Sequence, residues 1–182
     1  MSGYVEQVHE RIFLIGYRGT GKSTISTILA ARLGWDAVDA DIVLEAKVGS
    51  TIQTIFQSHG EATFRDHESA VLTELAMRER IVIATGGGVV LRPENRQRVR
   101  TGFVVWLRAR PETIDHRLHI DPTTAARRPN LTAMGGLAEI QTVLALREPL
   151  YAECADLILD TDDPSPEPLA DAILAAWNHH SR

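Results

Sequence analysis

The chain of 182 residues carries a formal net charge of −5, with 44% hydrophobic and 24% charged residues. This composition matches one ordinary globular domain, argues against a disordered chain, and through its acidic balance argues against a nucleic-acid-binding protein. No apolar run reaches bilayer-spanning length and residues 1–10 lack a signal peptide's apolar region, so we expect a cytoplasmic protein that binds no membrane. We also expect a monomer.

Five short apolar runs alternate with segments of helical periodicity. The runs are nearly continuous, as expected for parallel strands buried on both faces, and cover residues 12–15, 37–38, 81–84, 103–107 and 157–159. The helical segments cover residues 22–33, 61–79, 93–100, 111–119, 137–152 and 167–178. This alternation predicts an α/β fold with a parallel sheet and right-handed crossovers. We expect a single domain over residues 1–182, with its core at residues 11–178.

A long connection interrupts the alternation at residues 121–136, which read DPTTAARRPNLTAMGG. Connections in α/β units are usually short, so a segment of this length without periodicity is either functional or mobile. The adjacent arginines Arg127 and Arg128 stand in it, just before Pro129.

The strongest motif is GYRGTGKS at residues 16–23, which matches G-x-x-x-x-G-K-[ST] and stands between an expected strand and an expected helix. Its glycines allow backbone N–H groups to converge on phosphate oxygens, and the helix N-terminus adds partial positive charge. Lys22, one of only two lysines beside 17 arginines, can reach the β- and γ-phosphates, and the Ser23 hydroxyl can ligate Mg²⁺. The motif predicts a nucleotide-phosphate site.

Two carboxylates, Asp39 and Asp41, follow the second strand. Ligands of open α/β sheets bind beyond the carboxyl ends of the strands, where one carboxylate can hold the magnesium shell and the other can accept a proton from an attacking hydroxyl. The alternative interpretation is a loop aspartate and a helix N-cap, because the chain from Ile42 onward is compatible with a helix.

Three glycines at 86–88 follow the third strand and either let a ligand approach the backbone or form a tight turn. Arginines are the other candidates for anion binding: Arg65 is followed by Glu68 on the same helix face, and Arg147 stands in LREPLY. Most single arginines are solvated surface groups, and the sequence alone does not bring these side chains together. Cys154 stands alone, which excludes an intramolecular disulfide, and the histidines lack metal-ligand spacing.

Taken in order, six motifs resemble the shikimate kinase family, over residues from about 11 to 174. They are the P-loop, Asp-x-Asp, Phe-Arg, Gly-Gly-Gly, the loop Arg-Pro and Arg-x-Pro-Leu-Tyr. Each motif is moderately specific, and the ordered set is highly specific. The resemblance implies a P-loop kinase of the nucleoside-monophosphate-kinase group, with strand order 2-3-1-4-5, a substrate-binding region at about 41–70 and a mobile lid at about 120–136. It also implies the reaction of ATP with shikimate to give ADP and shikimate 3-phosphate.

The resemblance implies roles for the residues of the nucleotide site. Mg²⁺ would be ligated by Ser23 and reached through water by Asp39. Arg117 is similar in placement to the residue that stacks on adenine, opposite a loop proline that aligns with Pro166. The ATP phosphates would be held by Gly19, Thr20, Gly21, Lys22, Ser23 and Thr24.

The resemblance also implies roles at the acceptor site. Asp41 would bind the substrate hydroxyls and act as base, while Arg65 and Arg147 would grip the shikimate carboxylate. Gly87 and Gly88 would supply backbone donors. In the lid, Arg128 resembles the arginine that closes over the transferring phosphate and joins Lys22 and Asp41 as a catalytic group.

The sequence departs from the family pattern in a longer lid that reads Arg-Pro-Asn-Leu from residue 128, and in Asp162-Asp163-Pro164, where a basic residue often stands. The nearest alternative is a gluconate-type kinase of the same fold, with a nucleoside monophosphate kinase less favoured. The alternative from another class is a non-catalytic nucleotide-binding module. Against that module stands the joint presence of Lys22, Asp41, Arg65, Arg128 and Arg147.

Overall fold

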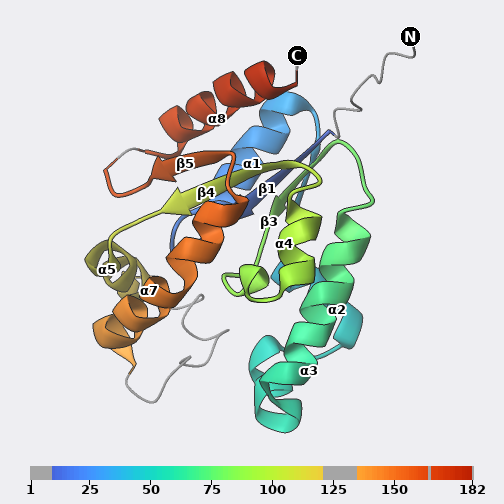
Figure 1. Ribbon diagram of the computed structural model, residues 1–182, viewed down its shortest axis with the longest axis vertical. Helices are drawn as coiled ribbons and strands as arrows, with labels where there is room; N and C mark the ends of the chain where they lie inside the picture. Colours follow the sequence, from blue (N-terminus) through green and yellow to red (C-terminus); the bar gives the residue numbers. More distant parts are fainter. Residues whose placement is uncertain (1–9, 121–134, 164, 182) are drawn as a thin grey trace.

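A computed structural model describes residues 10–120, 135–163 and 165–181 (Figure 1). Its centre is a sheet of five parallel strands in the order β2-β3-β1-β4-β5, so the expected order and strand direction are confirmed. The strands are β1 (Arg11–Ile15), β2 (Asp36–Asp39), β3 (Ile81–Ala84), β4 (Phe103–Arg108) and β5 (Leu157–Asp160).

The prediction that every strand is buried on both faces holds for the three central strands and is wrong for the two at the edges. In the register, Phe13 of β1 pairs with Ile83 of β3 and Val104 of β4, and all three side chains are buried. Strands β2 and β5 each have a neighbour on one side only, and every residue in them is partly or fully exposed. Position in the sheet, which residue composition does not encode, decides this difference.

Helices connect the strands, and most begin and end within two residues of the expected positions. They are α1 (Lys22–Leu33), α2 (Ala40–Val48), α3 (Ile52–Leu75), α4 (Pro93–Val99), α5 (Pro111–Ile120), α7 (Gly136–Cys154) and α8 (Pro166–His180), with a short 3₁₀ helix η1 (Val89–Leu91).

The expected helix at residues 61–79 is wrong at both ends. Helix α3 begins at Ile52, and Gly60 bends it with a non-helical conformation (φ 78°, ψ 174°) that a residue without a side chain adopts readily. It ends at Leu75, because the following residues turn into β3 and Arg80 takes a left-handed conformation (φ 56°). The helix α2, weighed only as an alternative, is present and packs beside α3.

The apolar residues form a core on each face of the sheet. Helices α1 and α8 cover one face through residues such as Leu29 and Ile173, and α2, α3, α4 and α7 cover the other through residues such as Leu44 and Leu72 (Figure 1). A smaller cluster joins α5 to α7 around Ile114. Within the described ranges, no helix combines the length and the apolar character that a membrane crossing requires.

The parallel arrangement brings the carboxyl ends of β1, β2 and β3 to one edge of the sheet. The P-loop follows β1, Asp39 ends β2, and the glycine run follows β3. Three motifs that are separate in the sequence therefore meet at this edge, where ligands of open α/β sheets bind.

Candidate active site

The P-loop between β1 and α1 depends on glycine at two positions. Gly16 has φ 135°, and a Cβ atom there would overlap the carbonyl oxygen of Leu107. Gly21 has φ 90° and precedes the first helical residue, Lys22. The loop folds around the lysine, whose Nζ donates to the carbonyl oxygens of Gly16 at 2.8 Å and Tyr17 at 2.7 Å. The ammonium group is thus held inside the loop, beside the N-terminus of α1.

Asp39 connects the P-loop to helix α2. Its Oδ2 accepts a hydrogen bond from the Ser23 hydroxyl at 2.7 Å, and its Oδ1 accepts one from the backbone N–H of Asp41 at 3.0 Å. The second bond makes Asp39 the N-cap of α2. The alternative interpretation, a helix N-cap, is therefore correct for Asp39, and the same carboxylate also contacts the P-loop serine.

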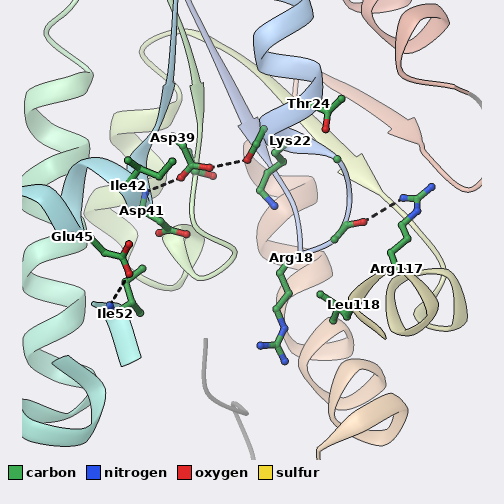
Figure 2. Close-up of a pocket in the computed structure, with 14 residues that line it drawn as sticks. Arg18, Lys22, Thr24, Asp39, Asp41, Ile42, Glu45, Ile52, Arg117 and Leu118 are labelled. Carbon is green, nitrogen blue, oxygen red and sulfur yellow. Dashed lines mark hydrogen bonds between the residues drawn. The ribbon is translucent and has the colours of Figure 1, made fainter. Parts of the chain in front are cut away.

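A cavity of about 290 Å³ opens in front of the P-loop (Figure 2), and we call it the P-loop cavity. In the view of Figure 2, Asp39 and Asp41 stand on one side of it and Arg117 on the other. The cavity is lined by Arg18, Gly19, Gly21, Lys22, Ser23, Thr24, Asp39, Asp41, Ile42, Glu45, Ile52, Thr85, Arg117 and Leu118.

Arg117 lies on the α5 side of this cavity. Its guanidinium donates to the Thr161 carbonyl oxygen, to the Thr161 hydroxyl at 3.1 Å and to the Gly19 carbonyl oxygen at 3.3 Å. Asp162, one of the two acidic residues that depart from the family pattern, accepts from the backbone N–H of Arg110 at 3.0 Å. Its carboxylate therefore binds the backbone directly before α5, which begins at Pro111.

A second, smaller cavity of about 40 Å³ adjoins the first, and we call it the arginine cavity. Its polar side chains come from the P-loop, α2, α3 and α7, and its apolar ones include Phe56 and Phe64. It is lined by Tyr17, Arg18, Asp41, Ile52, Phe56, Phe64, Arg65, Glu68, Gly86, Gly87, Gly88 and Arg147.

Two carboxylates hold Arg65 in the arginine cavity. Its Nη1 contacts Glu68 Oε2 at 2.8 Å, and its Nη2 and Nε contact Glu61 Oε1 at 3.0 and 3.2 Å. Burial alone would lower the pKa of Arg65, but Glu68 and Glu61 raise it above its ordinary value. The guanidinium therefore stays charged and has a fixed direction.

The glycine run at 86–88 makes room for these side chains. A Cβ atom on Gly86 would lie 2.9 Å from both Asp41 Oδ1 and Glu68 Oε1, and one on Gly88 would overlap the Arg65 guanidinium. None of the three glycines has a positive φ, so the requirement is for space and not for backbone freedom. The sequence suggested close approach of a ligand or a tight turn, and the structure adds packing of the cavity's own charged groups as a reason.

Arg147 and Tyr151, one turn apart on α7, both bond to the carbonyl oxygen of Gly87. Arg147 Nη1 donates at 3.1 Å, and the Tyr151 hydroxyl donates as well. Burial raises the pKa of Tyr151 to about 12, so this hydroxyl keeps its proton and its hydrogen bond at neutral pH. The two bonds attach the Arg147 end of α7 to the glycine run.

The structure brings most of the predicted residues together. Lys22, Ser23, Asp39 and Arg117 line the P-loop cavity, and Asp41 lines both cavities. Arg65, Gly87, Gly88 and Arg147 line the arginine cavity. Pro166 begins α8 and does not line either cavity, and Thr20 is buried with its hydroxyl donating to the Tyr17 carbonyl oxygen. Arg127, Arg128 and Pro129 lie outside the described residues.

Sequence reasoning missed Arg18 and Glu139. Arg18 occupies a variable position of the P-loop motif and lines both cavities, and Glu139 of α7 is its ion-pair partner at 3.0 Å. Nothing in the local pattern marks Glu139, because its partner is distant in the sequence.

The family model for shikimate kinase matches residues 18–178. The chain belongs to the shikimate kinase family. Shikimate kinase of Rhodopirellula baltica is 43% identical over 168 residues, which are 92% of this chain and 90% of that protein. Members of the shikimate kinase family are ATP-dependent kinases, so this chain is one as well.

Solved structures agree with this assignment. Shikimate kinase from Acinetobacter baumannii in complex with shikimate superposes with a TM-score of 0.88 at 34% identity, covering 96% of both chains. A gluconokinase from Sinorhizobium meliloti superposes with a TM-score of 0.58 at 17% identity, which shows a shared fold. The expected fold group is thereby confirmed.

Proposed function

We propose that the protein transfers the γ-phosphoryl group of ATP to the 3-hydroxyl of shikimate, giving ADP and shikimate 3-phosphate. The observation that carries this proposal is the position of Asp41, which lines both the P-loop cavity and the arginine cavity. A phosphate-binding cavity and a cavity that suits a small carboxylate meet at one carboxylate side chain. This is the arrangement that a kinase for a small hydroxy acid requires.

The P-loop cavity is the proposed ATP site. Gly19, Gly21 and Thr24 would surround the phosphates, and Lys22 would turn from its two carbonyl partners toward the β- and γ-phosphates. Arg117 would lie at the adenine end, because its guanidinium is held at Thr161, away from Asp41.

The chemistry of Ser23 and Asp39 fits Mg²⁺. A hydroxyl and a carboxylate that already contact each other at 2.7 Å offer the hard oxygen donors that this ion prefers. When bound, Mg²⁺ would neutralise charge on the phosphate oxygens. Ser23 would be a direct ligand, and Asp39 would act through water while it continues to cap α2.

The arginine cavity is the proposed shikimate site. Arg65 and Arg147 would bind the carboxylate of shikimate, which suits their charge and their planar donors. Glu68 and Glu61 set the direction of Arg65, and the Gly87 carbonyl oxygen sets that of Arg147. The carboxylate end of the substrate would thereby be fixed, and the hydroxyl end would face Asp41.

Asp41 is the proposed base. It is 8% exposed and stands in the first turn of α2, where its backbone N–H is held by Asp39. The 3-hydroxyl oxygen would form a bond to the γ-phosphorus while the bond from that phosphorus to the β–γ bridging oxygen breaks. The hydroxyl proton would pass to the Asp41 carboxylate, and the bridging oxygen would leave on ADP. Lys22 would stabilise charge on the phosphates, and Arg128 of the lid is proposed to do so as well.

A coupled ADP-release assay with Mg-ATP tests this proposal. Shikimate, gluconate and a nucleoside monophosphate are offered separately as acceptors. We expect turnover with shikimate and a far lower rate with the other two, because two arginines in a small cavity select a compact carboxylate. The absence of turnover with shikimate would refute the proposal, and faster turnover with gluconate would assign the other acceptor.

A further inference from the structure

Arg18 stands where the two cavities meet. The residues that line both cavities are Arg18, Asp41 and Ile52, and Arg18 is the cationic member of this set within the described part of the chain. In the view of Figure 2 its side chain extends from the P-loop between Ile52 and Leu118. Its backbone nitrogen would be 3.6 Å from a Cβ atom on Gly87, so the loop at this point packs against the glycine run.

Two neighbours hold the Arg18 guanidinium. Its Nη2 donates to Glu139 Oε1 at 3.0 Å, and its Cζ lies 5.7 Å from the centre of the Tyr17 ring. The side chains of Arg18 and Glu139 are 11% and 1% exposed, so solvent screens the pair only weakly. A guanidinium has five N–H donors in a fixed fork, which allows one arginine to bind a carboxylate and a phosphate oxygen together.

The other described cations of the two cavities each line one cavity only and are held there by partners. Lys22 is held by the P-loop carbonyl oxygens, and Arg117 is held at Thr161. Arg65 and Arg147 are fixed within the arginine cavity. In the proposed reaction the phosphoryl group would pass between the cavities, and Arg18 lines both of them.

We propose that Arg18 is a further catalytic residue, which contacts the equatorial oxygens of the phosphoryl group during transfer, and that Glu139 is its positioning residue. This inference rests on the proposed function. As the acceptor oxygen bonds to phosphorus, the bond to the bridging oxygen of ADP breaks and the acceptor proton moves to Asp41. Arg18 gains and loses no atoms in this step. It stabilises the charge spread over the three oxygens, which is greatest in the transition state.

The test compares Arg18→Met and Arg18→Lys with the wild type, and Arg32→Met serves as the matched control. Arg32 also forms an ion pair, with Asp171, but lies on α1 outside both cavities. Steady-state assays give kcat and both KM values, calorimetry gives the Kd of ATP and of shikimate, and thermal melting reports the fold. A further binding measurement uses ADP with aluminium fluoride, which imitates the transferring phosphoryl group, with and without shikimate.

We expect Arg18→Met to lower kcat about 10²- to 10³-fold while the Kd of each substrate changes little. The tighter binding of ADP that aluminium fluoride and shikimate produce together in the wild type should be lost. Arg18→Lys should recover part of kcat, because it keeps the charge without the fork. Arg32→Met should match the wild type. If Arg18→Met does not fold, Arg18→Lys carries the test, with a reduced kcat and unchanged Kd values expected.

Two results would overturn the inference. One is a kcat of Arg18→Met close to that of the wild type. The other is a loss confined to the KM for shikimate, which would make Arg18 a ground-state ligand of the acceptor. Failure of the wild type itself to phosphorylate shikimate would instead refute the proposed function, so the two failures are distinguishable.

Glu139→Gln tests the positioning role. It keeps the shape of the side chain and removes the charge, so we expect an intermediate loss of kcat with unchanged Kd values. The double variant Arg18→Met/Glu139→Gln should be no slower than Arg18→Met alone, since the glutamate acts through the arginine. Additive losses in the double variant would contradict this role.

Discussion

A methyl group on Gly88 would overlap the Nη1 atom of Arg65 and lie 2.5 Å from its Nη2. The third glycine of the run thus marks the space that the guanidinium occupies. Gly88 has φ −99°, a value open to any residue, so alanine would meet a steric obstacle and no backbone strain. Substitution of Gly88 by alanine should therefore displace the Arg65 guanidinium without disturbing the backbone of the loop.

We therefore expect Gly88→Ala to raise the KM for shikimate strongly and to leave the Kd of ATP near its wild-type value. The added methyl forces Arg65 out of its place, and such overpacking costs about 1–3 kcal/mol of stability. Steady-state kinetics and thermal melting measure the two effects. In the Arg65→Ala background the same change should cost little, because the overlapping group is gone. An equal cost in both backgrounds would contradict the steric explanation.

Asp41→Asn should remove the proposed base while it preserves the shape of the side chain. The bond from the Asp41 backbone N–H to Asp39 remains, so helix α2 should keep its cap. We expect kcat to fall by about 10²- to 10⁴-fold, the range of general-base catalysis, with ATP still bound. Single-turnover transfer and ATP calorimetry check this expectation. Substantial remaining turnover would exclude Asp41 as the base.

Two substitutions of Asp39 distinguish its role as a helix cap from its proposed role in metal binding. Asp39→Ala should lose about 0.5–2 kcal/mol of unfolding free energy, because the cap of α2 disappears. Asp39→Asn should lose little, since asparagine is an equally good cap. Both variants should need more Mg²⁺ for half-maximal activity, measured by titration with denaturation experiments alongside. If Asp39→Asn showed the wild-type Mg²⁺ requirement, its carboxylate would not belong to the metal site.

Arg147→Ala should affect the acceptor far more than the nucleotide. A hydrogen bond to a charged group contributes about 1.5–3 kcal/mol, so we expect the KM for shikimate to rise about 10- to 100-fold. The KM for ATP should stay within a few fold of the wild-type value. Arg96→Ala is the control, because Arg96 also bonds a carbonyl oxygen, that of Val90, but lines neither cavity. Equal changes in both KM values would mean that Arg147 is not a carboxylate ligand.

Cys154 should be unreactive in the folded protein. It is 3% exposed, and burial raises the pKa of its thiol from the ordinary 9.0 to about 11. The folded state therefore holds the proton up to a higher pH than the unfolded state does, and at pH 8 only about one thiol in a thousand is ionised. Iodoacetamide should label the native protein far more slowly than the urea-unfolded protein. Comparable labelling rates at pH 8 would contradict this environment.

The sequence by itself determined the features that rest on contiguous residues. The P-loop is a local strand–loop–helix, so its residues, including one of only two lysines, could be assigned without tertiary information. All five strands and most helices were located within two residues, because burial imposes a pattern along the chain. Even the strand order followed from the ordered motifs through the family they resemble. The kink at Gly60 was not predicted, because a glycine at this position is equally compatible with a loop.

Only the tertiary structure decided which side chains meet. Arg65 and Arg147 come from α3 and α7 and line one cavity because both helices pack on the same face of the sheet. The junction at Asp41 and the pair of Arg18 with Glu139 likewise depend on packing between distant elements. The periodicity of a sequence predicts which face of a helix or strand a side chain lies on. The residues that this side chain contacts depend on which neighbouring element packs against that face. The charged groups around the two cavities are therefore defined by contacts that exist only once the sheet and its helices have assembled.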